Sequence, residues 1–346
     1  MGAEGPEAPL VTAVMIFLNG EKYIAEAIES VLAQTCRAWE LVLVDDGSTD
    51  GATTIARSYA ERHPDKIRYI DHPGHANRGM SASRNAGVAE GRGQYISFLD
   101  ADDIWLPDRL ERFLQVARDF PSAGMIYGPT LYWFSWAVPD EKRGAPKDHV
   151  GELSLPTRRL LPTPMVLREF LLSEGGSLPG ICSLLVRRDA YEAVGGFEPS
   201  FRGLYEDQVF LSKMAAHHPI VVIDEVLDYY RQHEESCCSR ALVTGDYDPN
   251  GHHPARATYL RWLSDYLPAT GITDPVIVAA IARQLWPYDH PLYIAAARQL
   301  RRARFAILRL LKHVVPEPMR RALRRLQHAK AIRRQGAASA LADHRR

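Results

Sequence analysis

Short apolar runs alternate with amphipathic segments along the first third of the chain, and this alternation limits it to a small set of folds. Residues 11–18 form a continuous apolar run, and a second run of the same kind covers residues 40–44. Such runs are typical of strands that are buried on both faces. Between them, the apolar positions of residues 24–32 recur three and four residues apart, as on one face of a helix. We therefore expect an α/β fold with a mostly parallel sheet covered by helices.

The alternation continues with apolar runs at residues 67–70 and 94–99 and a helical segment at residues 81–89. Residues 131–160 show no clear period and are rich in proline, aromatic and charged residues, so we expect a loop or insertion over the functional site. Regular patterns then return. They predict a strand at residues 181–186, a short helix at residues 188–194, another helix from Glu206 onward and a bent strand at residues 219–230.

Helical patterns without strand-like runs follow residue 240. We place a domain boundary there, with an α/β domain at residues 1–240 and a helical extension at residues 241–346. Residues 298–334 contain thirteen Lys or Arg residues and one acid, Glu317, and their apolar positions fall on one helical face. Basic amphipathic helices of this kind can lie on an anionic membrane surface. Packing on the domain with a solvated basic face is the alternative, and we expect no nucleic-acid binding.

Acidic side chains follow two of the expected strands at the point where each strand ends. Asp45 and Asp46 end the second strand, and Asp100, Asp102 and Asp103 end the fourth. Ligands of such sheets bind outside the carboxyl ends of the strands, and we expect these two strand ends to be neighbours. Carboxylate oxygens are the ligands that Mg²⁺ and Mn²⁺ prefer. The acids therefore predict a site in which one carboxylate holds a divalent cation and another contacts the ribose of a nucleotide.

Each acidic group also has a simpler interpretation. Asp103 or Asp108 can serve the N-terminus of the helix expected near Pro107. The carboxylate of Asp46 can accept a hydrogen bond from a nucleobase, or it can form an Asx turn or helix cap within the Asp-Gly-Ser sequence. The sequence leaves these alternatives open, although a cap does not explain three acids directly after a buried strand.

Three further segments carry side chains that suit a phosphorylated substrate. Arg84 can pair with a phosphate or hold an aspartate in place, or it can be a solvated helix charge. Glu206 and Asp207 open a helix, so an acid there can accept the proton of an attacking hydroxyl or be an ordinary N-terminal acid. His233 can bind a metal or a diphosphate, with Arg231 supporting that charge, or it can be a surface histidine.

The cysteines and the first residues of the chain argue against two other classes of protein. The four cysteines form no C-x-x-C pair, and we interpret them as buried or incidental thiols. Residues 1–10 lack the apolar segment of a signal peptide. No apolar run approaches the roughly 18 residues of a membrane span. We therefore expect a cytoplasmic protein with reduced thiols, which would lie on the inner face of the membrane if the basic segment binds lipid.

These motifs, in this order and at compatible spacing, resemble the family 2 glycosyltransferases with the GT-A fold. The resemblance rests on residues 45–48, 79–87, 100–105 and 206–207, and it covers roughly residues 10–238. It implies a GT-A sheet flanked by helices, with the C-terminal helical extension added. It also implies an enzyme that depends on Mn²⁺ or Mg²⁺ and inverts the anomeric centre by single displacement.

The resemblance implies a role for each motif residue. Asp207 is implied as the general base, with Glu206 beside it. We assign the metal to Asp102, Asp100 and His233. The nucleotide-sugar contacts are assigned to Asp45 at the nucleobase, Asp46, Arg84, Asp100 at the ribose, and Phe17 and Asn19 after the first strand.

The implied reaction is the transfer of one hexose from a nucleotide-diphosphate sugar, with UDP as the expected nucleotide. The expected acceptor is a saccharide or a lipid-linked saccharide in glycan or cell-envelope synthesis. The lack of a Gln-x-x-Arg-Trp motif favours single-sugar transfer over polymer synthesis with export. One rival is a sugar nucleotidyltransferase, which needs a glycine-rich phosphate loop where residues 17–21 read Phe-Leu-Asn-Gly-Glu. The other is a catalytically degenerate scaffold of the same fold, although both the metal acid and the base are present.

Overall fold

The computed structural model describes residues 9–137, 147–173, 178–247, 252–296, 299–300 and 303. The chain divides into two compact units, residues 1–285 and 286–346, and the elements that shape the site belong to the first unit. The predicted domain boundary at residue 240 stays a prediction. The predicted basic segment at residues 298–334 lies almost entirely outside the described residues.

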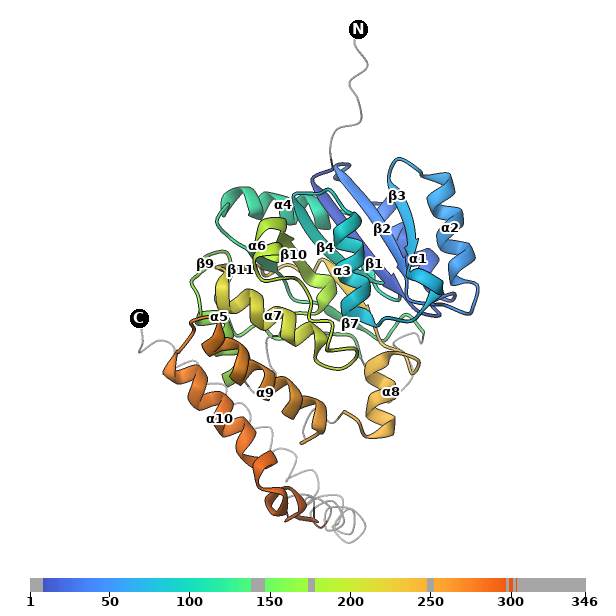
Figure 1. Cartoon of the computed structure of the whole chain (residues 1–346). Helices are drawn as coiled ribbons and strands as arrows, with labels where there is room; N and C mark the ends of the chain where they lie inside the picture. Colours follow the sequence, from blue (N-terminus) through green and yellow to red (C-terminus); the bar gives the residue numbers. More distant parts are fainter. Residues whose placement is uncertain are drawn as a thin grey trace, which may run out of the picture. The chain divides into compact units, whose positions relative to one another are not determined.

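The amino-terminal part follows the predicted alternation of strands and helices (Figure 1). In chain order its elements are β1 (Val11–Phe17), α1 (Ile24–Leu32), β2 (Trp39–Asp45), α2 (Ala52–Arg62), β3 (Ile67–Asp71), η1 (Pro73–His75), α3 (Met80–Glu90) and β4 (Tyr95–Asp100). The later elements are β5 (Ile104–Trp105), α4 (Arg109–Asp119), β6 (Met125–Tyr127), β7 (Leu131–Trp133), β8 (His149–Val150), β9 (Leu160–Leu161), α5 (Met165–Leu172), η2 (Ile181–Ser183), β10 (Leu184–Arg187), α6 (Arg188–Ala193), α7 (Glu206–His217), β11 (Ile220–Val222), β12 (Asp228–Arg231), α8 (Cys237–Thr244), α9 (Pro254–Ala269) and α10 (Pro275–Asp289).

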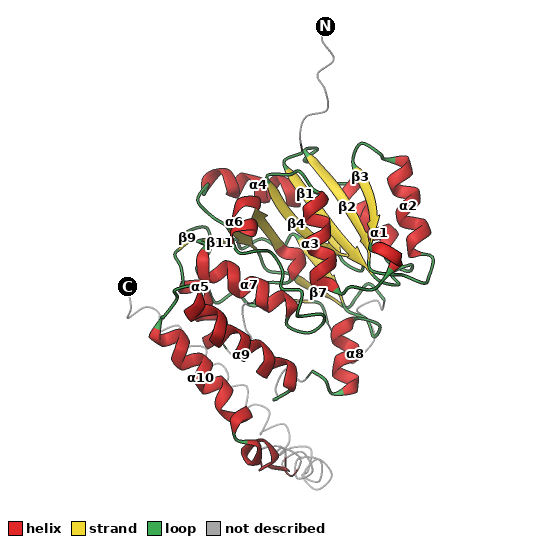
Figure 2. Cartoon of the chain, viewed as in Figure 1, coloured by secondary structure: helices red, strands yellow, loops and turns green. Residues whose placement is uncertain are grey.

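One large sheet forms the centre of the first unit (Figure 2). Its strand order is β3-β2-β1-β4-β10-β6-β11-β9. β1 pairs in parallel with β2 and β4, and β2 pairs in parallel with β3, whereas β10 runs antiparallel to β4 and β6. Every residue of β1 and β2 is buried, which explains why their sequences are continuously apolar and do not alternate.

The two acid-bearing strand ends are not neighbours, and in this respect the expectation from the sequence was wrong. β1 lies between β2 and β4, with Val14 paired to Val42 on one side and to Phe98 on the other. The ends of β2 and β4 are therefore about 10 Å apart, since adjacent strands are spaced by roughly 5 Å. Because all three strands run in the same direction, both acidic ends still open on the same edge of the sheet.

A second, smaller sheet with the order β5-β12-β7-β8 lies beyond the end of β4. The bent strand expected at residues 219–230 is two strands in different sheets: β11 pairs with β6, and β12 pairs with β5 and β7. Residues 131–160, expected as a loop, contribute the short strands β7, β8 and the start of β9. Of the strand expected at residues 181–186, the first half forms the η2 turn.

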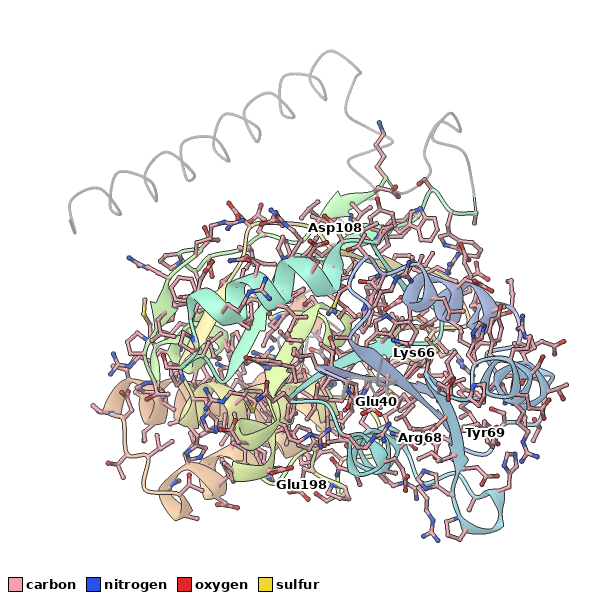
Figure 3. The ribbon with its side chains drawn as sticks, turned by 90° about the horizontal axis from the view of Figure 1, so that it is seen from above. Glu40, Lys66, Arg68, Tyr69, Asp108 and Glu198 are labelled. Carbon is pink, nitrogen blue, oxygen red and sulfur yellow. The ribbon has the colours of Figure 1, made fainter. Side chains whose placement is uncertain are left out.

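A buried carboxylate links neighbouring strands by hydrogen bonds at the end of the large sheet away from the acidic strand ends. Glu40 on β2 is 3% exposed and accepts hydrogen bonds from the Thr12 hydroxyl at 2.8 Å and from Arg68 Nη2 at 3.0 Å. Figure 3 labels Glu40 and Arg68. The backbone N–H groups of Arg92 and Gly93 also donate to it. Burial opposes ionisation, but these hydrogen bonds and the arginines together lower the pKa of Glu40.

The elements described after residue 240 are the end of α8 and the helices α9 and α10. α9 packs on α7, and Leu260 and Leu263 of α9 are fully buried. Helices from the carboxyl half are thus part of the same core as the sheet. Within the described residues, no helix has both the length and the apolar character that a membrane crossing requires.

Candidate active site

A cavity of about 840 Å³ opens at the carboxyl ends of β1 and β4. Its walls come from the segments after these strands, from the start of α3 and α7, and from the helices after residue 240. Nearly every residue that the sequence predicts for the site lines this one cavity. These lining residues are Phe17, Asn19, Asp46, Arg84, Asp100, Asp102, Glu206, Asp207 and His233.

Asp45 is the predicted site residue that the structure places outside the cavity lining. It is fully buried at the end of β2, where its carboxylate accepts hydrogen bonds from the Ser48 N–H at 2.7 Å, the Thr53 hydroxyl and the Tyr69 hydroxyl at 3.2 Å. The sequence offered a role in this turn for Asp46, and the structure gives it to Asp45 instead. The carboxylate therefore fixes the turn between β2 and α2.

Asp46 faces the cavity and holds the loop that leads into α3. Its carboxylate accepts hydrogen bonds from the backbone N–H groups of Arg78 at 2.6 Å and Gly79 at 3.0 Å. Gly79 has a φ of +87°, and a Cβ at this position would lie 3.3 Å from Arg202. Glycine is thus required both by the backbone conformation and by the close approach of Arg202. The backbone consequently stays open to the cavity beside Asp46.

Arg84 connects the two acidic groups of the cavity. The side chain is 2% exposed, and it donates from Nη1 to Glu206 Oε1 and from Nη2 to Asp100 Oδ1, the latter at 2.8 Å. Burial disfavours a guanidinium charge, but the two carboxylates outweigh it and raise the pKa of Arg84. The arginine therefore remains charged, and the solvated-charge alternative does not apply.

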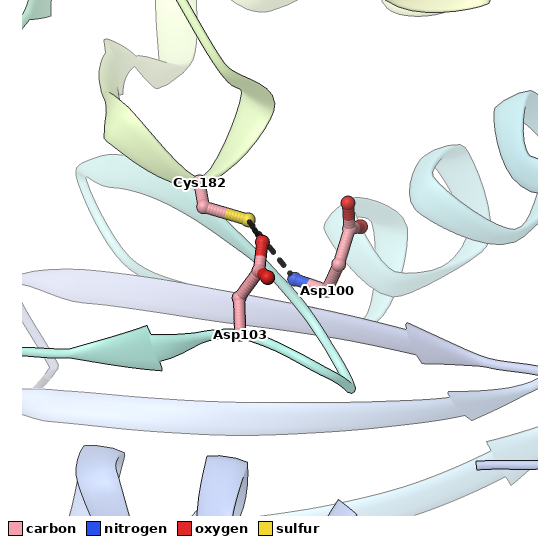
Figure 4. A group of neighbouring side chains, drawn as sticks. All are labelled: Asp100, Asp103 and Cys182. Atoms are coloured by element: carbon pink, nitrogen blue, oxygen red, sulfur yellow. Dashed lines mark hydrogen bonds between the residues drawn. The ribbon is translucent and has the colours of Figure 1, made fainter. Parts of the chain in front are cut away.

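The turn after β4 concentrates negative charge in a small volume (Figure 4). The Asp103 N–H donates to the Asp100 carbonyl at 3.0 Å, and the Asp103 carboxylate accepts from the Cys182 thiol at 2.9 Å and from the Arg231 N–H at 2.9 Å. Burial, and then the charges of Asp102 and Asp100, raise the pKa of Asp103 well above its usual range. Asp103 is thus not a helix cap. Asp108 holds the N-cap position of α4 but makes no capping hydrogen bond with its side chain.

The carboxylates of this turn suit a hard divalent cation, whereas the thiol that lies with them is not a ligand that such a cation prefers. One ligand atom each from Asp100, Asp103 and Cys182 lie within 4.8 Å of one another, and Asp102 lies beside them in sequence. Burial and the charge of Asp102 raise the pKa of Asp100, despite the neighbouring Arg84. Repulsion among closely spaced carboxylates is what a bound cation relieves, and carboxylate oxygens suit Mg²⁺ or Mn²⁺.

His233 reaches the acidic turn from the segment after β12. Its Nε2 lies 2.9 Å from Asp102 Oδ2, and its ring packs 4.7 Å from the ring of Tyr23 and 6.4 Å from that of Trp136. The neighbouring Arg231 donates from Nε to the Asp102 carbonyl at 2.7 Å. The structure thus brings together the predicted pair of Asp102 and His233, with Arg231 bracing the turn.

A strained residue presents Glu206 and Asp207 to the cavity. Tyr205, directly before them, has a φ of +72°, which is rare for a bulky side chain and is typically held in place at functional sites. Its ring stacks on Tyr259 of α9 with centroids 5.3 Å apart, and its hydroxyl lies 3.2 Å from His253 Nε2. Packing from α9 therefore fixes the start of α7.

The two acids at the start of α7 differ in their surroundings. Glu206 is 4% exposed, and burial raises its pKa to about 7 even though Arg84 favours the charged form. Its second oxygen, Oε2, is buried without a hydrogen-bond partner among the described residues. Burial also raises the pKa of Asp207, which is half-buried and carries no ion pair in the described part of the chain. Perturbed acids in a cavity are typical of catalytic sites.

Several residues of the cavity escaped the sequence reasoning. Cys182 was interpreted among the buried or incidental thiols; it is buried, and in addition its thiol donates to Asp103 from the middle of η2. Arg256 and Tyr259 line the cavity from α9, a helix that was assigned to a separate extension. A single cysteine and ordinary helical residues carry no sequence signal of this kind, because Cys182 is brought to the site by the packing of η2 on β4, and Arg256 and Tyr259 by the packing of α9 on α7.

Comparisons with known proteins agree with this geometry. Residues 12–193 match the family model described as Glycosyl transferase family 2. An uncharacterized glycosyltransferase of Nostoc sp. strain PCC 7120 is 28% identical over 264 residues, which cover 75% of this chain and 76% of that protein.

Two solved structures have a similar fold. A mannosyltransferase from Pyrobaculum calidifontis, in complex with GDP-Man and Mn²⁺, has a TM-score of 0.55 and 19% identity over 97% of this chain and 81% of its own. Residues 1–349 of S. aureus TarS, in complex with UDP-GlcNAc, give a TM-score of 0.54 and 18% identity over 74% of this chain and 65% of that one.

The large sheet flanked by helices, with its cavity at the carboxyl ends of the parallel strands, is the GT-A fold of nucleotide-sugar-dependent glycosyltransferases. The family model covers more than half of the chain, so this protein belongs to glycosyl transferase family 2.

Proposed function

We propose that this chain is an inverting glycosyltransferase that moves one hexose from a nucleotide-diphosphate sugar to an acceptor hydroxyl. The observation that carries the proposal is the buried bridge formed by Arg84, which donates to both Glu206 and Asp100. One guanidinium thereby joins the acids proposed for catalysis to those proposed for the metal. Buried and coupled ionisable groups of this kind are typical of a reaction centre.

The donor nucleotide is assigned to the part of the cavity formed by the ends of β1 and β2. Phe17 and Asn19 follow β1 and Asp46 follows β2, and all three line the cavity. The nucleobase contact of Asp45 stays a prediction, because its carboxylate already accepts hydrogen bonds within the chain. UDP is the expected nucleotide. The two similar structures carry UDP-GlcNAc and GDP-Man, so both nucleotides belong in the test.

The metal is assigned to Asp102, Asp100 and His233, and Mn²⁺ or Mg²⁺ fits this donor set. When bound, the cation supplies positive charge that neutralises the diphosphate leaving group. The Mn²⁺ in the similar mannosyltransferase supports this choice of metal. In this chain, two hydrogen bonds hold the turn that carries the acids: Arg231 donates to the Asp102 carbonyl, and Cys182 donates to the Asp103 carboxylate. The acids therefore keep their positions before any ligand arrives.

Asp207 is the proposed general base, which accepts the proton of the attacking acceptor hydroxyl. Arg84 and the N-terminal end of α7 both favour a negative charge at this position. Glu206 holds Arg84 from the same helix turn, so the guanidinium stays oriented toward Asp100. Attack on the side opposite the leaving nucleotide inverts the anomeric centre in a single step.

The acceptor is expected to be a saccharide or a lipid-linked saccharide, in glycan or cell-envelope synthesis. Peripheral contact with an anionic membrane through residues 298–334 and a location on the inner face of that membrane stay predictions, since that segment lies outside the described residues. Neither a degenerate scaffold nor a sugar nucleotidyltransferase is favoured by a specific feature of the cavity.

To test the reaction itself, the purified protein is incubated with UDP- or GDP-sugars and Mn²⁺, and the sugars are followed by proton NMR. We expect the protein to consume either UDP-sugars or GDP-sugars. The sugar in the product should have the anomeric configuration opposite to that in the donor. Retention of configuration would exclude single displacement. In a parallel mixture of nucleoside triphosphate, sugar phosphate and Mn²⁺, formation of a nucleotide sugar and pyrophosphate would identify a nucleotidyltransferase.

A further inference from the structure

The wall of the cavity that faces away from the strand ends comes from helices α5, α9 and α10. It combines aromatic and apolar side chains with one arginine. The lining residues on this side include Phe170 and Leu171 of α5, Arg256 and Tyr259 of α9, and Gln284 of α10. No role in donor or metal binding falls to them.

Arg256 is oriented by hydrogen bonds to uncharged groups, here called the Gln284 relay, and these leave its positive charge without a counter-ion. Its Nη2 donates to Gln284 Oε1 at 2.7 Å, and Gln284 Nε2 in turn donates to the Leu171 carbonyl at 2.6 Å. Among the described residues, no carboxylate lies within the 4.0 Å that defines an ion pair with Arg256. Arg84, by contrast, is compensated by two carboxylates in the same cavity. A fixed guanidinium without a counter-ion is a preorganised receptor for an anion.

The helix that carries this arginine packs on the helix that begins with Glu206 and the proposed base. Tyr259 of α9 hydrogen-bonds to Ser212 of α7 at 2.7 Å and stacks on Tyr205, which directly precedes Glu206 and Asp207. The charges of Asp207 and Arg256 act in opposite directions on the pKa of Tyr259, which burial raises to about 12. One tyrosine thus lies within electrostatic reach of both groups. An acceptor whose hydroxyl meets Asp207 would extend along this wall.

We propose that Arg256 selects an acceptor that carries an anionic group, either a phosphate or a carboxylate, close to the hydroxyl that is glycosylated. The inference rests on the proposed function, because it treats this wall as the acceptor side. Leu171, whose carbonyl accepts from Gln284, also lines the cavity and adds an apolar side chain to this wall. The Gln284 relay keeps the planar donor group fixed, so that it can bind two oxygens of one anion.

Binding measured by calorimetry tests the inference without any need for turnover. The chain, saturated with Mn²⁺ and UDP or GDP, is titrated with glucose, glucose 6-phosphate, glucuronic acid and dodecyl phosphate. We expect the anionic probes to bind at least about tenfold more tightly than glucose. Arg256→Gln should lower the affinity for the anionic probes by roughly 10- to 100-fold, the effect of losing hydrogen bonds to a charged group.

Two further variants separate charge from geometry and from general damage. Arg256→Lys keeps the charge but loses the planar fork, so its affinity for the anionic probes should lie between those of the wild type and Arg256→Gln. Arg283→Gln is the matched control, since Arg283 is the exposed neighbour of Gln284 on α10 and does not line the cavity. This control should bind every probe as the wild type does.

Three results would overturn the inference: no preference of the wild type for anionic probes, equal affinities in Arg256→Gln, or an equal loss of nucleotide affinity in that variant. Tighter binding of dodecyl phosphate than of glucose 6-phosphate would assign the anion to a lipid-linked acceptor, and the reverse order to a charge on the sugar. Loss of anion binding in Arg256→Gln, with no turnover of any donor by the wild type, would uphold the anion site and reject the proposed function.

Discussion

His233 Nε2 lies 2.9 Å from Asp102 Oδ2, and the two residues are 131 positions apart in the sequence. The histidine follows β12 of the smaller sheet, whereas the aspartate belongs to the turn after β4 of the larger sheet. Both residues line the cavity, so their contact joins segments that follow strands of the two sheets. The ring is held by packing against Tyr23, since its Nδ1 is buried without a hydrogen-bond partner among the described residues.

Replacing His233 tests whether this nitrogen binds the metal. If His233 is a ligand, His233→Ala should raise the Mn²⁺ concentration for half-maximal activity by about tenfold or more, because a ligand is lost from the cation. Activity at varied Mn²⁺ measures this directly. His63→Ala is the control, since His63 ends α2 outside the cavity. An unchanged Mn²⁺ requirement in His233→Ala would show that the histidine only positions Asp102.

Asp207→Asn tests the proposed base. Removal of a general base typically lowers kcat by about 10²- to 10⁴-fold. We expect a loss in this range, together with nearly unchanged affinity for the donor nucleotide, because Asp207 is assigned to the acceptor hydroxyl. Asp108→Asn, an exposed change at the start of α4, controls for general damage. A fully active Asp207→Asn variant would require a different base.

The ionisation of Glu206 makes stability depend on pH in a definite direction. Burial disfavours the charged form and raises its pKa to about 7 in the folded chain, from the ordinary value of 4.5 that holds in the unfolded chain. The folded chain therefore holds a proton that the unfolded chain has lost, and the free energy of unfolding falls as pH rises from 5 to 7. Urea unfolding with EDTA at pH 5 and pH 8 should show this fall. The fall should be smaller in Glu206→Gln, and an equal fall in both chains would contradict the assignment.

Glu40 is predicted to stabilise the fold without affecting the site. Glu40→Ala leaves Arg68, Thr12 and two backbone N–H groups without their buried acceptor. The free energy of unfolding should fall by about 2 kcal/mol, because buried donors lose their acceptor while the arginine partners stay partly exposed to water. Urea unfolding measures this, with the exposed Glu61→Ala as the control. A loss below about 1 kcal/mol would mean that water replaces the carboxylate.

The amino-terminal fold could be read from the sequence because its signals are local. Buried parallel strands such as β1 and β2 appear as continuous apolar runs, and the acids after β2 and β4 mark the ligand edge by position alone. The strand order was less accessible. Nothing local in the sequence places β1 between β2 and β4, since that order depends on pairing between distant segments.

The remaining parts of the site depend on long-range packing. Cys182 reaches Asp103 only because η2 lies against the end of β4, and Arg256 reaches the cavity only because α9 packs on α7. Residues 219–230 were interpreted as one bent strand, yet β11 and β12 join different sheets. No periodicity indicates which sheet a short strand will join, so the smaller sheet was not predicted.

The central claim is that the acids after β4 bind a divalent cation needed to hold a nucleotide-sugar. The most direct measurement is calorimetric binding of a panel of UDP- and GDP-sugars, with and without Mn²⁺, to the wild type and to Asp102→Ala. We predict that a donor binds in the presence of Mn²⁺, binds at least about tenfold more weakly in EDTA, and loses its metal dependence in Asp102→Ala. Donor binding that is the same with and without Mn²⁺, or no binding of any donor by the folded wild type, would contradict this claim.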